Sequence, residues 1–155
     1  MKALILAAGK GSNLYPLTET RPKPMFSICG KPVLEYIIQG LVETGIHDIT
    51  MVIGQHGETI KNYFHRGERF GVNIQYIVQD EPLGLAHALK CALPWVDGDD
   101  VLMYLGDNLL EQDLHAFVAA FEGARTGTQP PAAQILLKEV DDPHRFGIAK
   151  MNSEL

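Results

Sequence analysis

The stretch that indicates the fold class is KALILAAGKGS, residues 2–12. Lys2–Ala7 is an almost wholly apolar run that is too short for a helix, and a turn containing Gly9 and Gly11 follows it directly. A short apolar run bounded by glycines is typical of a strand that is buried on both faces, as strands of parallel sheets are. We therefore predict a buried parallel strand over residues 2–7.

The rest of the chain alternates between helical and strand-like patterns. From residue 32 to residue 44, apolar side chains recur every three or four positions between Pro32 and Gly45, which predicts a helix. Pro94 is expected to end a later helix, and Asp113 could cap the next one. The other expected elements are helices over residues 58–69, 84–93 and 114–121, strands over 49–53, 72–78, 101–105, 133–140 and 147–151, and a linker over 123–131.

This alternation predicts an α/β fold. Strands that alternate with helices form right-handed crossovers, which give a three-layer, doubly wound, mostly parallel sheet with helices on both faces. In such sheets, ligands bind beyond the carboxyl ends of the strands. Three segments leave those ends with unusual side chains: residues 8–24, 79–86 and 106–108.

Length and composition favour one soluble domain over residues 1–155. The chain has 155 residues, of which 46% are hydrophobic, enough for one ordinary core. Cys29 and Cys91 lack a C-x-x-C spacing and provide no disulfide framework, so we expect a cytoplasmic protein. The first apolar run is shorter than the core of a signal peptide, and no segment is long enough to span a membrane.

Charge points to a small phosphate-bearing ligand rather than a nucleic acid. The formal net charge is −6, whereas nucleic-acid-binding surfaces concentrate Lys and Arg. Residues 1–31 nevertheless carry five cations and one acid, a local balance of +4. A phosphate-bearing ligand near these residues would suit this balance. A solvated loop whose cations favour solubility would also explain it.

The turn after the first predicted strand suits phosphate oxygens. Gly9 and Gly11 allow backbone amides to approach a ligand without interference from a Cβ. The turn matches neither the Walker A spacing nor the dinucleotide fingerprint, because Leu14 stands where a third glycine would be needed. Downstream, the prolines of Arg21-Pro22-Lys23-Pro24 stiffen the backbone around a lysine, which could neutralise a phosphate.

Three segments carry extended motifs in a fixed order. Residues 6–11 read Leu-Ala-Ala-Gly-x-Gly and are followed by Leu-x-Pro-Leu-Thr at 14–18 and Pro-Lys-Pro-Met at 22–25. Gln-x-x-Pro-x-Gly-Leu-Ala follows at 79–86, and Leu-Gly-Asp-Asn at 105–108. Together they resemble the signature of sugar-phosphate nucleotidylyltransferases, over nearly the whole chain. The Gly-Asp-Asn form looks most like glucose-1-phosphate thymidylyltransferases, with relatives that use UTP close behind.

The resemblance implies a Rossmann-like, glycosyltransferase-A-like fold, a reaction and a set of site residues. A nucleoside triphosphate, dTTP or UTP, would be joined to a sugar 1-phosphate, with release of pyrophosphate. Lys23 would contact the sugar phosphate and the α-phosphate, and Asp107 would ligate Mg²⁺, which prefers carboxylate and phosphate oxygens. The nucleotide-binding residues implied by the motifs are Leu6, Ala8, Gly9, Gly11, Gln79, Pro82 and Gly84.

Each of these residues also has a purely structural interpretation. Asp107 with Asn108 could form a turn after a strand, as these residue types often do. Gln79 could end a strand, and Gly84 could serve only to start a helix. The six histidines show no recurring metal-ligand spacing, so we interpret them as surface or packing residues.

The chain departs from the family pattern in two ways. The first motif normally carries an arginine two positions after its second glycine, where this chain has Asn13. Arginines on developing phosphate charge contribute about 10³ to 10⁵ in rate in other phosphoryl-transfer enzymes, and our hypothesis is that Lys10 or Arg21 compensates in part here. Family members also continue beyond residue 155 into a sugar-binding part, so the chain is expected to be truncated before that part.

Three functional hypotheses follow. The favoured one is a nucleotidylyltransferase represented by its N-terminal region, with glucose 1-phosphate as the sugar. The second is a non-catalytic nucleotide-binding or regulatory homologue, which Asn13 and the missing sugar site would fit. The third is an unrelated nucleotide-binding module such as a dehydrogenase domain. A homo-oligomer is also possible, because a final strand at the edge of the sheet could promote self-association.

Overall fold

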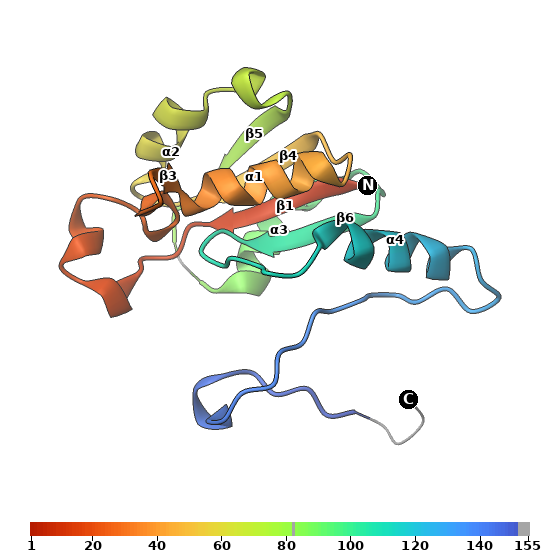
Figure 1. Ribbon diagram of the computed structural model, residues 1–155. Helices are drawn as coiled ribbons and strands as arrows, with labels where there is room; N and C mark the ends of the chain where they lie inside the picture. Colours follow the sequence, from red (N-terminus) through yellow and green to blue (C-terminus); the bar gives the residue numbers. More distant parts are fainter. Residues whose placement is uncertain (82, 152–155) are drawn as a thin grey trace. The chain divides into compact units, whose positions relative to one another are not determined.

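The structure is a computed structural model that describes residues 1–81 and 83–151 (Figure 1). The chain divides into two compact units, Met1–Val118 and Ala119–Leu155. Both sheets that the described residues form lie in the first unit.

The first unit is built on a parallel sheet of four strands. These strands are β1 (Lys2–Ala7), β4 (Asp48–Ile53), β5 (Asn73–Val78) and β6 (Val101–Leu105), in the order β5-β4-β1-β6. All three pairings between neighbours are parallel, and β1 is buried from Ala3 to Ala7. The predicted parallel sheet and its first four predicted strands are therefore confirmed. A short antiparallel pair, β2 (Ser27–Ile28) and β3 (Lys31–Pro32), is an addition that the sequence patterns do not predict.

Helices cover both faces of this sheet, as predicted. Side chains alternate between the faces of β1 because a strand has a period of two. Ala3, Ile5 and Ala7 pack with the apolar residues of α1 (Val33–Glu43) and α2 (Gly57–Phe64). Leu4 and Leu6 pack on the opposite face against α3 (Leu85–Val96). The result is the three-layer arrangement in Figure 1.

The register brings the carboxyl ends of the four strands to one edge of the sheet. Ala7 of β1 pairs with Ile53 of β4, and Ile53 pairs with Val78 of β5. On the other side, Leu6 pairs with Leu105, the last residue of β6. The loops that follow β1, β4, β5 and β6 therefore all leave from this edge.

Two helix ends differ from the prediction. The helix expected over residues 58–69 ends at Phe64, because His65 takes φ 49° and Gly67 takes φ 92°, which are not helical. The helix expected to end before Pro94 continues to Val96. A proline in the last turn of a helix removes one hydrogen bond and is tolerated there, and the left-handed Asp97 ends the helix instead.

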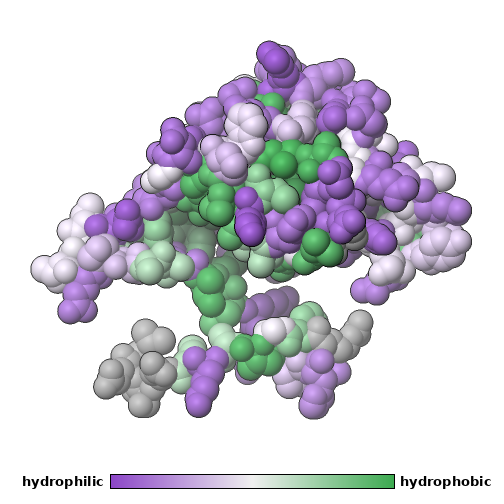
Figure 2. Space-filling model, turned by 180° about the vertical axis from the view of Figure 1, so that it is seen from behind, coloured by the Kyte–Doolittle hydropathy of each residue, from purple (hydrophilic) through white to green (hydrophobic). Residues whose placement is uncertain are grey.

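The exposed apolar residues of α3 were not anticipated. The small side chains of Ala88 and Ala92 face the sheet and are buried, whereas Leu85 and Leu93 are each 56% exposed. Figure 2 views the molecule from behind the face of Figure 1 and shows apolar side chains gathered on that surface. Alanines allow α3 to pack closely on the sheet, which leaves the larger leucines on the outer side of the helix.

The predicted cap of the next helix is confirmed. Asp113 Oδ1 accepts a hydrogen bond of 2.9 Å from the backbone N–H of His115 at the start of α4 (Leu114–Arg125). This helix runs into the second unit and takes up the first residues of the predicted linker. No helix within residues 1–81 and 83–151 is both long enough and apolar enough to cross a membrane.

The last two predicted strands are wrong. Within residues 119–151, neither the segment 133–140 nor the segment 147–151 forms a strand, and the only regular structure after α4 is a 3₁₀ turn at Pro143–Arg145. A strand is held in a sheet by backbone pairing with a neighbouring strand, and neither segment is part of the two sheets that the described residues form. Apolar alternation alone was therefore insufficient evidence for strands here.

Candidate functional site

The two glycines of the turn after β1 differ in how much space surrounds them. The fold requires a glycine at position 11, whereas it has room for a side chain at position 9. Gly11 has φ 61°, and a Cβ there would lie 2.8 Å from Cγ2 of Thr18. Thr18 is buried, and its hydroxyl donates a hydrogen bond of 3.0 Å to the carbonyl oxygen of Gly11. A Cβ on Gly9 would meet no atom within 4 Å. The turn is thus pinned at Gly11 and accessible at Gly9.

Lys23 and Asp107 meet at the same edge of the sheet. Lys23 begins a short 3₁₀ turn, Lys23–Met25, after the extended Pro22, and its Nζ lies 2.5 Å from Oδ2 of Asp107. Asp107 follows β6 after Gly106, whose N–H donates to the carbonyl oxygen of Leu6 at 2.9 Å. A Cβ on Gly106 would lie 3.0 Å from that oxygen, so glycine allows the end of β6 to approach β1.

Gln79 continues β5 and turns its side chain inward. Its backbone N–H donates to the carbonyl oxygen of Ile53 at 2.8 Å, and the residue is only 6% exposed. Its side-chain Nε2 lies 2.9 Å from Nδ1 of His87 and 3.4 Å from the carbonyl oxygen of Gly84. Gln79 and Gly84 are therefore brought together, whereas Pro82, between them in the same motif, lies outside the described residues.

The two alkyl residues of the first motif have different surroundings. Leu6 is buried in the core on the α3 face, among Val52 and Ala88, and offers its carbonyl oxygen to Gly106. Ala8 is half-buried and lines a pocket at the edge of the sheet. Gly54 comes so close to it that a Cβ on Gly54 would lie 2.8 Å from the carbonyl oxygen of Ala8.

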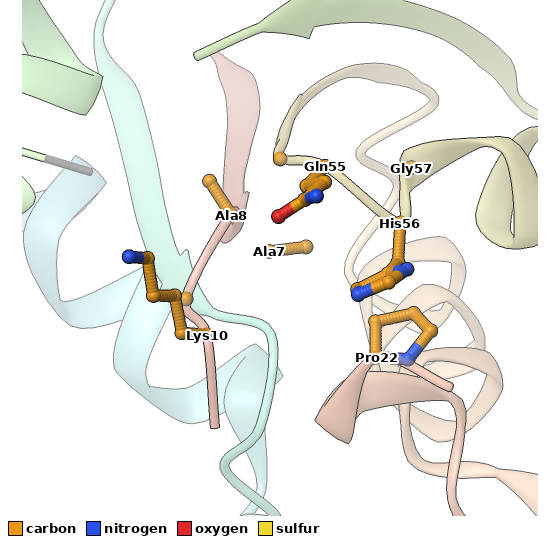
Figure 3. A pocket seen from close by; sticks show the side chains of 9 residues that line it. Ala7, Ala8, Lys10, Pro22, Gln55, His56 and Gly57 are labelled. Atoms are coloured by element: carbon orange, nitrogen blue, oxygen red, sulfur yellow. The ribbon is translucent and has the colours of Figure 1, made fainter. Parts of the chain in front are cut away.

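This pocket has a volume of about 200 Å³ and lies between the loops that follow β1 and β4 (Figure 3). Lys10 lies on one side of it, and His56 and Pro22 lie on the other. Gln55 and His56 were missed by the sequence analysis. The signal was present, because the segment 54–57 follows a buried strand and carries two glycines, which marks a loop at the same ligand-binding edge. The lining residues are Ala7, Ala8, Gly9, Lys10, Pro22, Gly54, Gln55, His56 and Gly57.

A larger hollow of about 490 Å³ lies at the opposite edge of the sheet. Its lining includes Lys2, Asp48 and Asn73, which begin β1, β4 and β5, together with Trp95. None of the sequence motifs contributes to it. Volume therefore does not identify the site here, and the placement of the motifs at the carboxyl ends does.

Four of the predicted site residues form two groups, which lie toward opposite ends of the sheet's carboxyl edge. Lys23 and Asp107 lie near the ends of β1 and β6, and Gln79 and Gly84 lie at the end of β5. Three strand spacings separate β5 from β6, which is about 14 Å. The glycine turn and the pocket lie between the two groups, so the arrangement is an elongated site with one amide end and one charged end.

The family model for nucleotidyl transferases matches residues 2–155. The chain belongs to the nucleotidyl transferase family. Two relatives fit this assignment: the low-salt glycan biosynthesis nucleotidyltransferase Agl11 of Haloferax volcanii is 44% identical over 99% of the chain, and a glucose-1-phosphate thymidylyltransferase of Streptomyces antibioticus is 39% identical over 99%. The chain spans 42% of the length of each of these two proteins.

Solved structures support the same fold. A Bacillus anthracis protein assigned as a glucose-1-phosphate thymidylyltransferase, crystallised with sucrose, superimposes with a TM-score of 0.89 at 34% identity. The match covers 99% of this nucleotidyl transferase chain and 61% of that protein. The α/β fold and the family resemblance expected from the sequence are therefore confirmed.

Asp107 is the residue of this nucleotidyl transferase site that could hold a metal ion such as Mg²⁺ together with a bound substrate. Within the described parts of the chain, no group of three or more His, Cys, Asp or Glu side chains is placed so that it could hold a metal ion without further ligands. Asp107 supplies one carboxylate, a third of which is exposed, beside the glycine turn. Mg²⁺ is usually held by one or two carboxylates together with substrate phosphates and water.

Proposed function

We propose that this chain is the nucleotide-binding part of a sugar-phosphate nucleotidylyltransferase that joins dTTP or UTP to glucose 1-phosphate and releases pyrophosphate. The observation that carries the proposal is the meeting of Lys23 and Asp107. Their side chains come from positions 84 residues apart and pair at 2.5 Å beside a glycine turn, at the edge where α/β sheets bind ligands. Relatives named as thymidylyltransferases and uridylyltransferases support the choice of base and sugar.

Each group of residues has a role in the proposed reaction. Gln79 and Gly84, with Leu6, Ala8 and Pro82, would hold the base. The amides around Gly9 and Gly11 would bind the phosphates. A Cβ on Gly9 would meet no atom within 4 Å, so a ligand can approach the backbone there. Lys23 would bind the α-phosphate and the sugar phosphate. The single domain predicted from the sequence would then be one nucleotide-binding piece of a longer enzyme.

The chemistry needs no nucleophile from the protein. An oxygen of the sugar 1-phosphate attacks the α-phosphorus in line, a new P–O bond forms, and the bond to the pyrophosphate oxygen breaks. Lys23 would stabilise the charge on the phosphoryl oxygens by position and electrostatics. Asp107 would hold Mg²⁺, which, when bound, neutralises charge on the phosphates.

Asn13 favours a second candidate function. It lies exposed in the 3₁₀ turn Ser12–Leu14 and brings no charge where the family pattern has arginine. Lys10 lines the adjacent pocket and could supply a charge instead. A chain that binds the nucleotide without turning it over, as a non-catalytic or regulatory homologue, is therefore the alternative.

A two-stage assay tests the proposal. Calorimetric titration of the chain with UTP and with dTTP, each with Mg²⁺, measures binding, and glucose 1-phosphate is then added while pyrophosphate is measured. Binding with pyrophosphate release supports the enzyme. Binding without release supports the non-catalytic homologue for this chain, and the absence of binding contradicts both.

A further inference from the structure

Next to Gln79 lie two polar side chains of α3, His87 and Cys91. Neither the motifs nor the proposed reaction gives them a role. His87, half-buried in the first turn of α3, places its Nδ1 2.9 Å from Nε2 of Gln79. Sγ of Cys91, one turn further along the helix, lies beside the same ring, 3.8 Å from Nε2 and 4.0 Å from Nδ1 of His87. These polar side chains thus connect the end of β5 to α3.

The geometry fixes which way the Gln79 amide points. The carbonyl oxygen of Gly84, 3.4 Å away, can only accept a hydrogen bond, so the group facing it is the NH₂ of Gln79. The same NH₂ faces Nδ1 of His87, which must therefore accept as well. An accepting Nδ1 requires a neutral imidazole with its proton on Nε2, the nitrogen that lies closer to the Cys91 sulfur.

This arrangement leaves the oxygen of the Gln79 side chain for a ligand. Both hydrogens of Nε2 are used, and Oε1 forms no hydrogen bond within residues 1–81 and 83–151. In those same residues, no side-chain nitrogen or oxygen that is fully enclosed lacks a partner. Oε1, which has no partner there, is therefore not fully enclosed, and a ligand can reach it although Gln79 is 94% buried.

We infer that His87 is a positioning residue that holds the Gln79 amide with its oxygen toward the base. An amide oxygen accepts, so the site would select a base with an N–H at the ring position facing it, as uracil and thymine have at N3. Cytosine presents a lone pair at that position and would be rejected, because two acceptors would face each other. The inference rests on the proposed function, in which Gln79 contacts the base.

Substitution of His87 separates this role from simple packing. His87→Leu fills similar space without an acceptor, which frees the amide to rotate. His87→Asn keeps an acceptor, because its side-chain oxygen lies close to the place of Nδ1. His115→Leu on the exposed side of α4 is the matched control. Affinities for UTP and CTP are measured by calorimetry for the unsubstituted chain and the three variants, with thermal unfolding to check the fold.

The expected readout is the ratio of the two affinities. The unsubstituted chain and His115→Leu bind UTP at least about tenfold more tightly than CTP. His87→Leu lowers the UTP affinity about three- to tenfold and brings the ratio close to one, whereas His87→Asn restores most of the preference. If His87 had only a packing role, His87→Leu would lower the affinities for UTP and CTP equally and leave their ratio unchanged.

A second measurement does not depend on any variant folding. Nitrogen-15 NMR of the unsubstituted chain reports which ring nitrogen of His87 carries the proton, and the inference requires Nε2. A proton on Nδ1, or an unchanged UTP-to-CTP ratio in His87→Leu, overturns the inference while the proposed function stands. If the unsubstituted chain binds neither nucleotide, the proposed function fails, and base selection by His87 fails with it.

Discussion

At the scale of single residues, Gly9 and Gly11 have opposite requirements. Gly11→Ala forces a side chain into a left-handed backbone and places its Cβ 2.8 Å from Thr18 Cγ2, which should lower the free energy of unfolding by about 1–2 kcal/mol or more. The Cβ added by Gly9→Ala meets no protein atom within 4 Å, so this substitution should change the free energy of unfolding by less than about 0.5 kcal/mol. Chemical denaturation measures both.

The matched pair also tests the phosphate turn. If the amides around Gly9 approach phosphates, the added methyl of Gly9→Ala should lower the UTP affinity although the fold is intact. A Gly9→Ala chain that binds UTP as tightly as the unsubstituted chain would argue against that contact.

The Lys23–Asp107 pair is expected to contribute to binding rather than to stability. Its side chains are 38% and 34% exposed, and ion pairs of this kind contribute about 0–1 kcal/mol to stability. Lys23→Met removes a charge-assisted contact to phosphate, so UTP affinity should fall at least about tenfold with little change in thermal stability. Lys61→Met, which breaks the ion pair with Glu58 on α2, is the control and should leave affinity unchanged. Equal effects of the two variants would contradict the assignment.

The sequence predicts these site residues unevenly. Lys23, Asp107, Gln79 and Gly84 stand in extended motifs, and the sheet topology brings them to the expected edge. His87 could not be found in this way, because its contact with Gln79 depends on how α3 starts after the left-handed Gly84. No spacing in the sequence encodes the direction in which α3 starts after Gly84.

At the scale of elements, Tyr76 links β5 to the end of α2. Its hydroxyl donates a hydrogen bond of 2.6 Å to the carbonyl oxygen of His65, and burial, helped by the charge of Glu68, raises the pKa of Tyr76 to about 12. The ordinary value for tyrosine is about 10. Between these values, the unfolded chain loses the proton while the folded chain keeps it, so stability falls as the pH rises from 10 to 12.

Tyr76→Phe removes this contribution to the pH dependence. The variant should be less stable than the unsubstituted chain at pH 9, because the hydrogen bond to His65 is lost. The difference should shrink as the pH rises toward 12. Urea unfolding at pH 9 and pH 11 measures it, and a difference that does not depend on pH would show that Tyr76 does not titrate as described.

The elements that sequence patterns predicted well are those whose partners lie within the described sheet. β1, β4 and β6 are short, mainly apolar runs, β5 alternates between polar and apolar side chains, and each pairs with at least one other strand. The segments 133–140 and 147–151 have similar alternation, but among the described residues they join neither sheet and form no strand. The leucines of α3 show a further limit, since periodicity identified the helix but not that Ala88 and Ala92 form its buried side.

At the scale of the whole molecule, the candidate site belongs entirely to the first unit. Every residue assigned to it lies before Val118, where that unit ends. A chain that stops after Arg125, at the end of α4, should therefore bind UTP within about twofold of the 155-residue chain. Calorimetry on the two proteins compares them. A loss of binding on truncation would show that the second unit contributes to the site. Self-association, which the sequence left possible, stays a prediction that light scattering can check, although the final strand that was its reason does not form among the described residues.

The most direct test of the central claim is an NMR titration of the nitrogen-15-labelled chain with UTP and Mg²⁺. The account predicts that the largest shifts fall on the backbone amides of Gly9, Gly11, Gln79 and Gly84, at the carboxyl edge of the sheet. Shifts concentrated instead around the hollow at the other edge, on Asn73 and Trp95, would contradict it.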